Sequence, residues 1–473
     1  MKVLIASNNL GKVREFKKLL DKFDIEFTTL KELNCTLEPV ENGKTLIENA
    51  LIKAKYYFDL YQMPVIADDT GLFIKGLNNE PGIYAARYSG KGDQENRNKV
   101  LKNLTSVDRS AYFETALIYY DGVDIVSSVG RLFGEISHSE KGHNGFGYDS
   151  IFYIPKLNKT LAEIDEDTKN EFSHRHNAIV GLAFKLTFMF NKDNHINYLT
   201  KLFKQLYPND DIKIIHKLSG GMSNDTYLVE TNTFKKVVRI PGNSADVYVD
   251  RLNELNGLKL VENNEHFIQY DYFDLNTGVK ISPFIEQDSN EIDYLGLANR
   301  LEELHHYEGF TNKYLAFDKL EYYISLNNIF NVKLGSQFEE LYDKLLNYKQ
   351  ELINRPLTFC HNDNQLSNFI LGKKGYTLID FEFVGLNDPL FDFACFGNND
   401  LEIGKKAFSE LQKRPLSKEE EKVIELWYSV QALNWFLVAT FKHYTGMSER
   451  LGLNFLEIAT MFLTKANNLL KKY

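Results

Sequence analysis

The sequence has few cysteines, no long apolar run and no surplus of basic residues. Only Cys35, Cys360 and Cys395 occur among its 473 residues, and their spacing fits neither a disulfide framework nor a zinc site. No stretch approaches the roughly 20 apolar residues of a membrane span. The apolar run near the start, Val3 to Ala6, is too short for the core of a signal peptide. We therefore expect a protein of the reducing cytoplasm with no membrane contact.

The charge balance is acidic, with 55 Lys and Arg against 65 Asp and Glu and a net charge of −10. This argues against a general nucleic-acid binder, because affinity for a phosphate backbone comes from a surplus of basic residues. A hydrophobic fraction of 43% and a charged fraction of 25% are typical of a globular protein. The length predicts about two or three domains.

The first candidate site is a phosphate-binding corner near the N-terminus. Val3 to Ala6 predicts a strand, residues 7–12 (SNNLGK) a polar turn, and Val13 to Leu20 a helix. The N–H groups at the start of a helix and the Lys12 ammonium would hold an anion well. The long glycine-rich spacing of a P-loop is absent. A helix cap with a solvated lysine is the alternative interpretation.

Adjacent carboxylates follow a short buried strand, in Asp68-Asp69-Thr70-Gly71. Such neighbours repel each other unless a cation or a proton intervenes, which favours a divalent metal. Simple surface exposure is the alternative. Thr45 and Glu48 have the spacing of a helix capping box, so Glu48, and Lys53 on the same predicted helix, have a purely structural interpretation.

A glycine-rich loop, Gly142 to Asp149, carries aromatic side chains and one acidic side chain. Phe146 could stack on a base, while Asp149, His174 and Arg175 could contact the edge of that base. Each of these residues also has a structural interpretation, such as a turn or a surface cation.

The segments SNNLGK, ENGKTLIENA, IADDTGL, PGIYAARYSG, NGFGYD and SHR together resemble the inosine triphosphate pyrophosphatase family over roughly residues 1 to 190. The resemblance implies an α/β fold with a long central mixed sheet, a homodimer formed through this domain, and Mg²⁺-dependent hydrolysis of ITP, dITP and XTP to monophosphate and pyrophosphate. It implies that Glu41 and Asp69 bind the metal and that Asp69 activates water. The nucleotide-binding residues that it implies are Ser7, Asn8, Asn9, Lys12, Thr70, Phe146, Gly147, Tyr148, Asp149, Lys169, His174 and Arg175.

The polar stretch Asn191 to Asn197 lacks periodicity, and the sequence pattern before it differs from the pattern after it. We therefore predict a first domain over residues 1–190, a linker over 191–207 that contains an amphipathic helix, and a second domain over 208–473.

The stretch from His361 to Phe383 places polar groups as phosphoryl transfer needs them. One carboxylate must orient the acceptor hydroxyl, while a side-chain amide and a second carboxylate hold Mg²⁺. Asp363, Asn368 and Asp380 have these residue types in this order. A polar loop between two strands is the alternative.

Features upstream of this stretch fit the same chemistry. Gly220 and Gly221 lie at the tip of a predicted hairpin, where backbone N–H groups can approach phosphates, and Arg239 lies on the next strand. We predict Glu254 as the partner of Arg239, with a solvated helix face as the alternative. Asp392 could cap or anchor the catalytic loop rather than touch substrate.

Residues 208 to 473 resemble the choline/ethanolamine kinase group of the aminoglycoside phosphotransferase superfamily. The resemblance implies a bilobal α+β kinase-like fold, ATP and Mg²⁺, Asp363 as catalytic base, and Asn368 and Asp380 as metal ligands. Gly220, Gly221, Asn224, Arg239 and Glu254 are then nucleotide-site residues.

The acceptor follows less directly from the sequence. A quaternary ammonium needs an aromatic cage, for which Trp427, Tyr428, Trp435 and Phe436 are available, and core packing of a helix is the alternative. Val438 stands where choline kinases often have a second Trp.

The sequence as a whole predicts a bifunctional enzyme that acts on small-molecule nucleotides and on a small alcohol. Choline or ethanolamine is the expected acceptor, and a sugar, a thiamine-like amine or an aminoglycoside is the alternative. A further alternative is that one half is a non-catalytic nucleotide-sensing or dimerising module.

Overall fold

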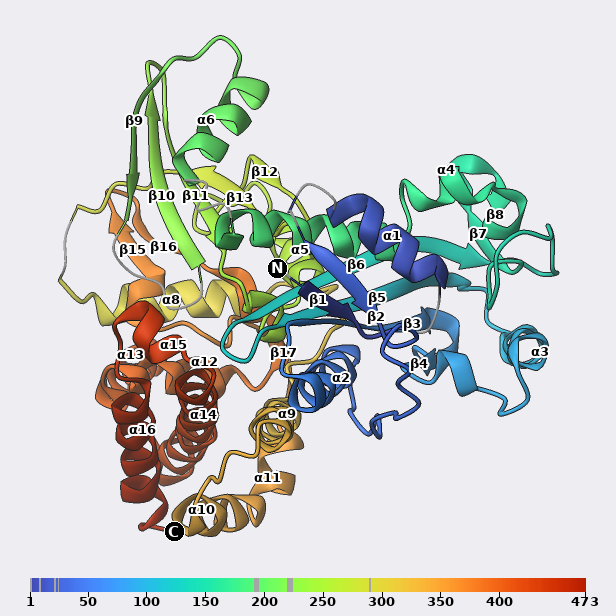
Figure 1. The fold of residues 1–473 in the computed structure, drawn as a ribbon. Coiled ribbons are helices and arrows are strands. Elements are labelled where there is room, and N and C mark those ends of the chain that lie inside the picture. The colour runs from blue at the N-terminus through green and yellow to red at the C-terminus, as the bar shows by residue number, and fades with distance from the viewer. Residues whose placement is uncertain are drawn as a thin grey trace. The chain divides into compact units, whose positions relative to one another are not determined.

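The computed structural model describes residues 2–7, 10–20, 23, 25–190, 195–218, 224–288 and 291–473. The chain divides into two compact units (Figure 1). The first contains Met1–Lys201, Gly242–Val247 and Leu275–Gly278, and the second contains Leu202–Pro241, Tyr248–Asp274 and Val279–Tyr473. Helix α6 (His195–Leu206) lies within the predicted linker. In the described part of the chain, we find no helix with the length and hydropathy needed to cross a membrane.

The first unit is built on a mixed eight-stranded sheet with the strand order β2-β1-β3-β5-β6-β7-β8 and β4 paired to β3. Its strands are β1 (Lys2–Ile5), β2 (Glu26–Thr29), β3 (Val65–Ile74), β4 (Pro81–Gly82), β5 (Ser110–Tyr120), β6 (Ile125–Ile136), β7 (Phe152–Ile154) and β8 (Lys159–Thr160). Its helices are α1 (Leu10–Leu20), α2 (Leu46–Tyr61), α3 (Asp93–Asn103), α4 (Glu166–Asn170) and α5 (His174–Phe190). Strand β1 is parallel to β2 and β3, and the pairs from β3 onward are antiparallel.

Helices α1 and α5 cover one face of this sheet, and α2 packs on the other (Figure 1). Alternating residues of β5, Leu117 and Tyr119, pack against Ile179 and Leu182 of α5 in one buried cluster. Because successive strand residues point to opposite faces, each strand can carry core residues on one face and site residues at its end.

The second unit has an antiparallel five-stranded sheet with the order β12-β13-β11-β10-β9, two small two-stranded sheets and a large helical part. Its strands are β9 (Ile212–Lys217), β10 (Asn224–Thr231), β11 (Lys235–Pro241), β12 (Tyr272–Phe273), β13 (Lys280–Pro283), β14 (Thr358–Cys360), β15 (Phe369–Gly372), β16 (Gly375–Leu378) and β17 (Gly385–Asn387). Its other helices are α7 (Arg251–Leu260), α8 (Tyr294–His305), α9 (Ala316–Ile329), α10 (Ser336–Leu346), α11 (Lys349–Ile353), α12 (Pro389–Cys395), α13 (Leu401–Gln412), α14 (Lys418–Tyr444), α15 (Met447–Leu451) and α16 (Phe455–Leu470).

The predicted fold class is confirmed for both units. The long mixed sheet with helices on both faces is the expected α/β architecture, and the second unit combines a sheet lobe with a helical lobe. Helix α14 begins with a capping box formed by Ser417 and Glu420 and is buried along most of its length. It is therefore the central helix of the helical lobe.

Candidate active sites

The adjacent carboxylates of the first unit lie on β3, and each has a lysine partner. Lys12 Nζ donates to Asp68 Oδ2 at 2.7 Å, and Lys53 Nζ lies 3.4 Å from Asp69 Oδ1. Asn49 Nδ2 donates to the other oxygen of Asp69 at 3.0 Å. The two cations therefore offset the repulsion between the neighbouring acids.

These two carboxylates differ in basicity. Burial raises the pKa of Asp69, and Lys53 offsets only part of this effect. Burial acts in the same direction on Asp68, but Lys12 and other nearby cations outweigh it and lower the pKa of Asp68 to about 2. Glu41 Oε2 lies 3.4 Å from Lys53 Nζ and adds a third carboxylate to the group. Asp69 is thus the better proton acceptor, beside the oxygen ligands that Mg²⁺ prefers.

Residues at the N-cap and in the first half of helix α2 make two kinds of contact: some cap the helix, and others contact Asp69. Glu48 is buried and accepts from the backbone N–H of Lys44, and the Thr45 hydroxyl caps the helix by accepting from Glu48 N at 3.1 Å. Asn49 and Lys53 instead contact Asp69. No sequence motif indicated Asn49, and Lys53 was given only a structural interpretation. The i, i+4 spacing of these two residues, which places them on one helix face, was the available signal.

His174 lies at the end of a partly buried chain of two threonine hydroxyl groups. Thr70 Oγ1 lies 2.8 Å from Thr115 Oγ1, which lies 2.6 Å from His174 Nδ1. The imidazole also stacks on Phe113 with the ring centroids 4.9 Å apart. Burial, together with nearby cations, lowers the pKa of His174 well below its usual value. The imidazole is therefore neutral at pH 7, and Thr115 is a site residue that no sequence motif indicated.

Arg175 is buried and anchored at one end. Its Nη1 donates to Glu15 Oε2 at 3.1 Å, whereas its Nε has no hydrogen-bond partner among the described residues. A buried N–H donor without a partner is costly, so a ligand oxygen that accepts from it would gain free energy. The guanidinium is therefore suited to donate a hydrogen bond to a carbonyl oxygen of a ligand.

The glycine-rich loop brings three predicted residues together. Asp149 Oδ2 accepts from Lys169 Nζ at 2.5 Å and from Phe146 N at 3.0 Å. Lys169 Nζ also lies 5.3 Å from the centroid of the Phe146 ring. Because the side chain of Phe146 is 60% exposed, its ring face is available to stack on a base.

Two predicted residues of this loop have structural surroundings. Tyr148 is buried in the core and donates from its hydroxyl to the backbone carbonyl of Ala85 at 2.7 Å, so the structure does not place its side chain toward a ligand. Gly147 adopts a φ of 60° and donates from its N–H to Asp93 Oδ2. Its role is to permit this turn.

The predicted phosphate corner is described only in part. Ser7 follows β1, and Lys12 lies on α1 with its ammonium on Asp68. Asn8 and Asn9 lie outside the described residues.

In the second unit, the predicted catalytic residues share one pocket. A cavity of about 540 Å³ is lined by Asp363, Asn368, Asp380 and Arg239, among others. Asn368 Nδ2 donates to the backbone carbonyl of Asp363 at 2.7 Å. Asp380 has a φ of 69°, a left-handed conformation that is uncommon for residues other than glycine and that recurs at functional sites.

Asp363 has the properties of a general base. Burial, followed by the neighbouring carboxylates Asp380 and Glu382, raises its pKa well above the usual value. Gln365 Nε2 donates to Asp363 Oδ1 at 3.4 Å. A carboxylate with a raised pKa takes a proton from an acceptor hydroxyl more readily.

The predicted pair of Arg239 with Glu254 is wrong. Arg239 Nη1 donates to Asp380 Oδ1 at 2.6 Å and lies 3.3 Å from Glu382 Oε1. Glu254, which is buried on α7, instead accepts from Lys280 and from Arg251. Lys280, a second buried cation on β13, therefore pairs with Glu254, which had been predicted as the partner of Arg239.

Glu382 and Lys280 are site residues that the sequence analysis missed. Burial would raise the pKa of Glu382, but Arg251 and Arg239 outweigh it and lower this pKa to about 2. Asn224, a predicted site residue, donates from Nδ2 to Glu382 Oε1 at 3.0 Å. Glu382 lies only two residues beyond Asp380, and this short distance in the sequence could have indicated it as a site residue. Gly220 and Gly221 lie outside the described residues.

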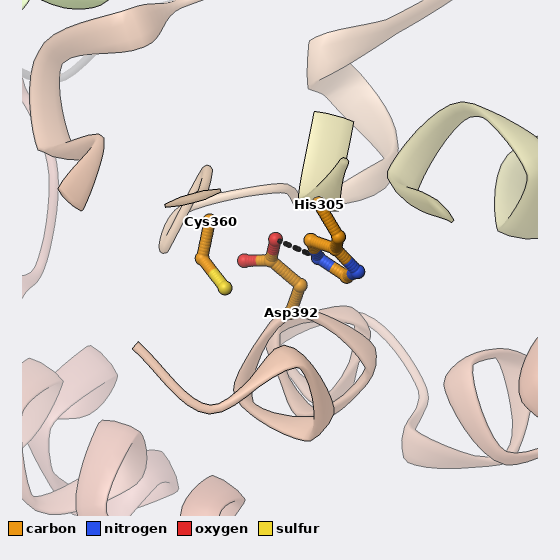
Figure 2. Close-up of side chains that lie close together, drawn as sticks. All are labelled: His305, Cys360 and Asp392. Carbon is orange, nitrogen blue, oxygen red and sulfur yellow. Dashed lines mark hydrogen bonds and ion pairs between the residues drawn. The ribbon is translucent and has the colours of Figure 1, made fainter. Parts of the chain in front are cut away.

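The catalytic loop is held from below by Asp392 on α12. Its carboxylate accepts from the backbone N–H groups of His361 and Asn362 at 3.0 and 2.8 Å, and from His305 Nε2 at 2.9 Å. Figure 2 shows the His305 imidazole and the Cys360 thiol on either side of this carboxylate. The three side chains are close enough to hold a metal, but His305 Nε2 and the Asp392 carboxylate bond to each other, and the Cys360 thiol donates to the backbone carbonyl of Asn387. We interpret the cluster as an anchor, which is the role predicted for Asp392.

Comparison with known proteins relates each unit to a different family. Residues 3–184 match the sequence model of the Ham1 family, and residues 287–433 match that of choline/ethanolamine kinase. A dITP/XTP pyrophosphatase of Dictyoglomus thermophilum is 43% identical over 180 residues, which are 37% of this chain and 88% of that protein. The dITP/XTP pyrophosphatase of Mannheimia succiniciproducens is 40% identical over 196 residues, 39% of this chain and 98% of the relative.

The second unit is similar to a solved choline kinase. The crystal structure of choline kinase LicA from Streptococcus pneumoniae matches with a TM-score of 0.50 and 22% identity, and it covers 59% of this chain and 100% of that chain. At this level of identity the likeness shows the fold, which is kinase-like.

Proposed function

Since the chain belongs to the Ham1 family and carries a choline/ethanolamine kinase-like domain after it, we propose that this enzyme has two activities. Its first unit hydrolyses the purine triphosphates ITP, dITP and XTP to the monophosphate and pyrophosphate. Its second unit transfers the γ-phosphoryl group of ATP to a small alcohol. The observation that supports the first activity is the group of Asp69, Glu41 and Lys53, and the second rests on Asp363, Asn368 and Asp380 in one pocket.

In the first unit, Asp69 takes a proton from the attacking water. The water oxygen bonds to the α-phosphorus, the bond from this phosphorus to its bridging oxygen breaks, and pyrophosphate leaves. Lys12 and the start of α1 bind phosphate oxygens. Asp69 and Glu41 supply oxygen ligands that fit Mg²⁺, which when bound neutralises the charge that develops on the phosphates.

Base selection uses donors that fit a 6-oxo purine. The Nε of Arg175 lacks a partner among the described residues, and the purine oxygen would accept from it. An adenine amino group would leave this donor unpaired, which penalises ATP at this site. Phe146 stacks on the base.

In the second unit, Asp363 takes the proton of the acceptor hydroxyl. The acceptor oxygen bonds to the γ-phosphorus, the bond from this phosphorus to the bridging oxygen breaks, and ADP leaves. Asn368 and Asp380 have the donor types that hold Mg²⁺ in such sites, and Arg239 pairs with the nucleotide phosphates. Choline, ethanolamine, sugars, thiamine-like amines and aminoglycosides are the candidate acceptors.

The test uses the full-length protein with Mg²⁺. We expect pyrophosphate release from ITP, dITP and XTP at a kcat/KM well above that for ATP, and ADP formation that depends on an added alcohol. Binding of ITP without turnover would contradict the first activity and favour a nucleotide-sensing module. A homodimer formed through the first unit belongs to the same proposal, and light scattering of the full-length protein tests it.

A further inference from the structure

One row of paired residues across the sheet of the first unit positions His174. Thr70 on β3 lies directly opposite Thr115 on β5, and Thr115 lies opposite Gly130 on β6. A Cβ atom added to Gly130 would lie 2.2 Å from the backbone carbonyl oxygen of His174 and 2.1 Å from the backbone nitrogen of Ala178. Glycine at this position therefore lets the first turn of α5 pack closely on the sheet, where the His174 side chain contacts Thr115.

The two threonine hydroxyl groups and the imidazole form a short hydrogen-bonded chain. Thr115 Oγ1 lies 2.8 Å from Thr70 Oγ1 and 2.6 Å from His174 Nδ1. Thr115 is fully buried, and neither hydroxyl group has another hydrogen-bond partner among the described residues. A hydroxyl group carries one proton, so Thr115 donates to only one of its two neighbours. The direction of this donation determines which ring nitrogen of His174 is protonated.

The imidazole has a single proton to place. His174 is 8% exposed, and burial together with nearby cations lowers its pKa well below the usual value. In a neutral imidazole one ring nitrogen is a donor and the other is an acceptor. Stacking on Phe113 and the contact with Thr115 hold the ring in one orientation. The chemical character of Nε2 therefore depends on whether Nδ1 donates or accepts.

The two possible directions of the chain leave different groups unpaired. If Thr70 donates to Thr115 and Thr115 donates to His174 Nδ1, both hydroxyl protons have acceptors, and only the proton on Nε2 lacks one. In the reverse direction, the Thr70 proton has no acceptor among the described residues, and Nε2 becomes an unpaired acceptor as well. Because unpaired polar groups of low exposure cost free energy, the first direction is favoured.

The charges that act on His174 belong to the proposed nucleotide site. Arg175, Lys169 and Lys12 lower its pKa, and Asp68 raises it. Lys169 is the cation beside the glycine-rich loop, and Lys12 is the cation of the predicted phosphate corner. The imidazole is therefore within electrostatic reach of the residues proposed to bind the base and of those proposed to bind the phosphates.

Two neighbouring donors at the start of α5 then lack protein acceptors. Arg175 Nε is buried without a partner, and no hydrogen bond between described residues involves His174 Nε2. A carbonyl oxygen has two lone pairs and can accept from both donors. An amino group in its place would leave both donors unpaired.

We propose that Thr115 is a positioning residue for base selection: its hydroxyl donates to His174 Nδ1 and thereby keeps the imidazole proton on Nε2, which donates to the 6-oxygen of the purine. This inference rests on the proposed pyrophosphatase function and deepens its selectivity. Without the Thr115 hydroxyl, the ring proton can exchange to Nδ1, and Nε2 can then accept from the amino group of adenine.

The tautomer can be measured directly. Long-range ¹H–¹⁵N correlation spectra of the full-length protein, labelled with [¹⁵N]histidine and recorded at pH 7 without nucleotide, distinguish protonated from unprotonated ring nitrogens. His174→Gln identifies the His174 signals among those of the 11 histidines. We expect Nε2 to be protonated and Nδ1 unprotonated in the wild type. A protonated Nδ1 would overturn the inference, whatever the behaviour of any variant.

Variants of Thr115 connect the tautomer to selectivity. Thr115→Val removes the hydroxyl group at nearly constant volume, and we expect the ratio of kcat/KM for ITP to that for ATP, measured as pyrophosphate release with Mg²⁺, to fall about tenfold or more. The spectrum should then show protonation of His174 Nδ1. Thr115→Ser retains the hydroxyl group and should keep both the ratio and the tautomer. Thr187→Val is the matched control on α5, because its hydroxyl bonds only to the backbone carbonyl of Ala183 in the same helix.

The possible outcomes separate this inference from the proposed function. Equal losses of ITP and ATP hydrolysis in Thr115→Val would indicate a purely structural role and would overturn the inference, as would an unchanged ratio at full activity. Absence of ITP hydrolysis by the wild type would instead contradict the proposed pyrophosphatase function.

Discussion

The guanidinium of Arg239 donates to Asp380 at 2.6 Å, so a strand residue neutralises the carboxylate proposed to hold a metal. The pair joins residues 141 positions apart in the sequence. Before nucleotide binds, this cation offsets the negative charge of the half-buried carboxylate. We expect the guanidinium to bind the phosphates when nucleotide and metal are present.

Replacement of Arg239 by Gln should therefore weaken nucleotide binding. We expect the KM for MgATP to rise about tenfold or more, equivalent to at least ~1.4 kcal/mol, because both the phosphate contact and the partner of Asp380 are lost. Arg239→Lys should recover part of the effect, since it retains charge but not the planar fork. Steady-state ADP formation checks this, and an unchanged KM in Arg239→Gln would contradict the phosphate-binding role.

Asp363→Asn should remove phosphotransfer. We expect a loss in kcat of about a hundredfold or more, because an amide cannot accept the proton of the hydroxyl. Asp343→Asn, an exposed change on α10, is the matched control and should retain full activity. Wild-type turnover by Asp363→Asn would exclude Asp363 as the base.

The raised pKa of Asp363 also predicts a pH profile. The protonated carboxyl group cannot act as base, so kcat/KM for the acceptor should fall as the pH decreases through this raised pKa. A normal carboxylate would keep full activity to lower pH. Flat kcat/KM down to the usual range of an aspartate would show that this group does not titrate as expected.

The sequence predicted site residues correctly where they lie close together along the chain. It failed where two residues distant in the sequence are paired by the fold. Asp363, Asn368 and Asp380 belong to one short stretch, and the structure brings all three to one pocket. The partner of Glu254 depended instead on the register of β11 and β13, which places Arg239 opposite Lys280. Both are cations on neighbouring strands, so local sequence could not decide between them.

Helical periodicity likewise predicted a helix without showing which of its faces meets the ligand. Trp427 and Trp435 lie eight residues apart on α14, yet Trp427 donates to Asp388 in the core while Trp435 lines the pocket. In the first unit, Tyr148 follows a glycine loop but packs in the core. Which side chain faces inward depends on tertiary packing, and a single sequence does not contain that information explicitly.

Asp69→Asn should abolish pyrophosphate release from ITP and leave ADP formation by the second unit intact. We expect a decrease in kcat of about a hundredfold or more, since the proton acceptor is lost. Asp59→Asn is the matched control, because Asp59 forms an exposed pair with Lys55 on α2. Loss of both activities in Asp69→Asn would indicate a folding defect, which thermal unfolding would reveal.

Asp392→Asn should loosen the catalytic loop of the second unit. An amide nitrogen would face backbone N–H groups of His361 and Asn362, so a buried donor would be left unpaired. We expect a loss of about 1–3 kcal/mol in stability together with reduced phosphotransfer. Urea unfolding measures the first effect, and unchanged stability would show that the loop is held by other contacts.

The neutral imidazole of His174 predicts that the first unit loses stability in mild acid. Because the folded state holds the pKa of His174 well below its ordinary value of 6.5, the unfolded chain binds a proton first as the pH falls. The free energy of unfolding should therefore be constant above pH 6.5 from this group and decrease below it, by up to ~1.4 kcal/mol per pH unit. Asp68, whose pKa is lowered to about 2, adds its own loss of stability only in stronger acid, below the ordinary aspartate pKa of 3.8. Hydrogen exchange of α5 amides at a series of pH values measures the effect in wild type and in His174→Gln. The difference between them should shrink as the pH falls below 6.5, whereas exposed His138→Gln should follow wild type, and a pH-independent difference would contradict a neutral buried imidazole.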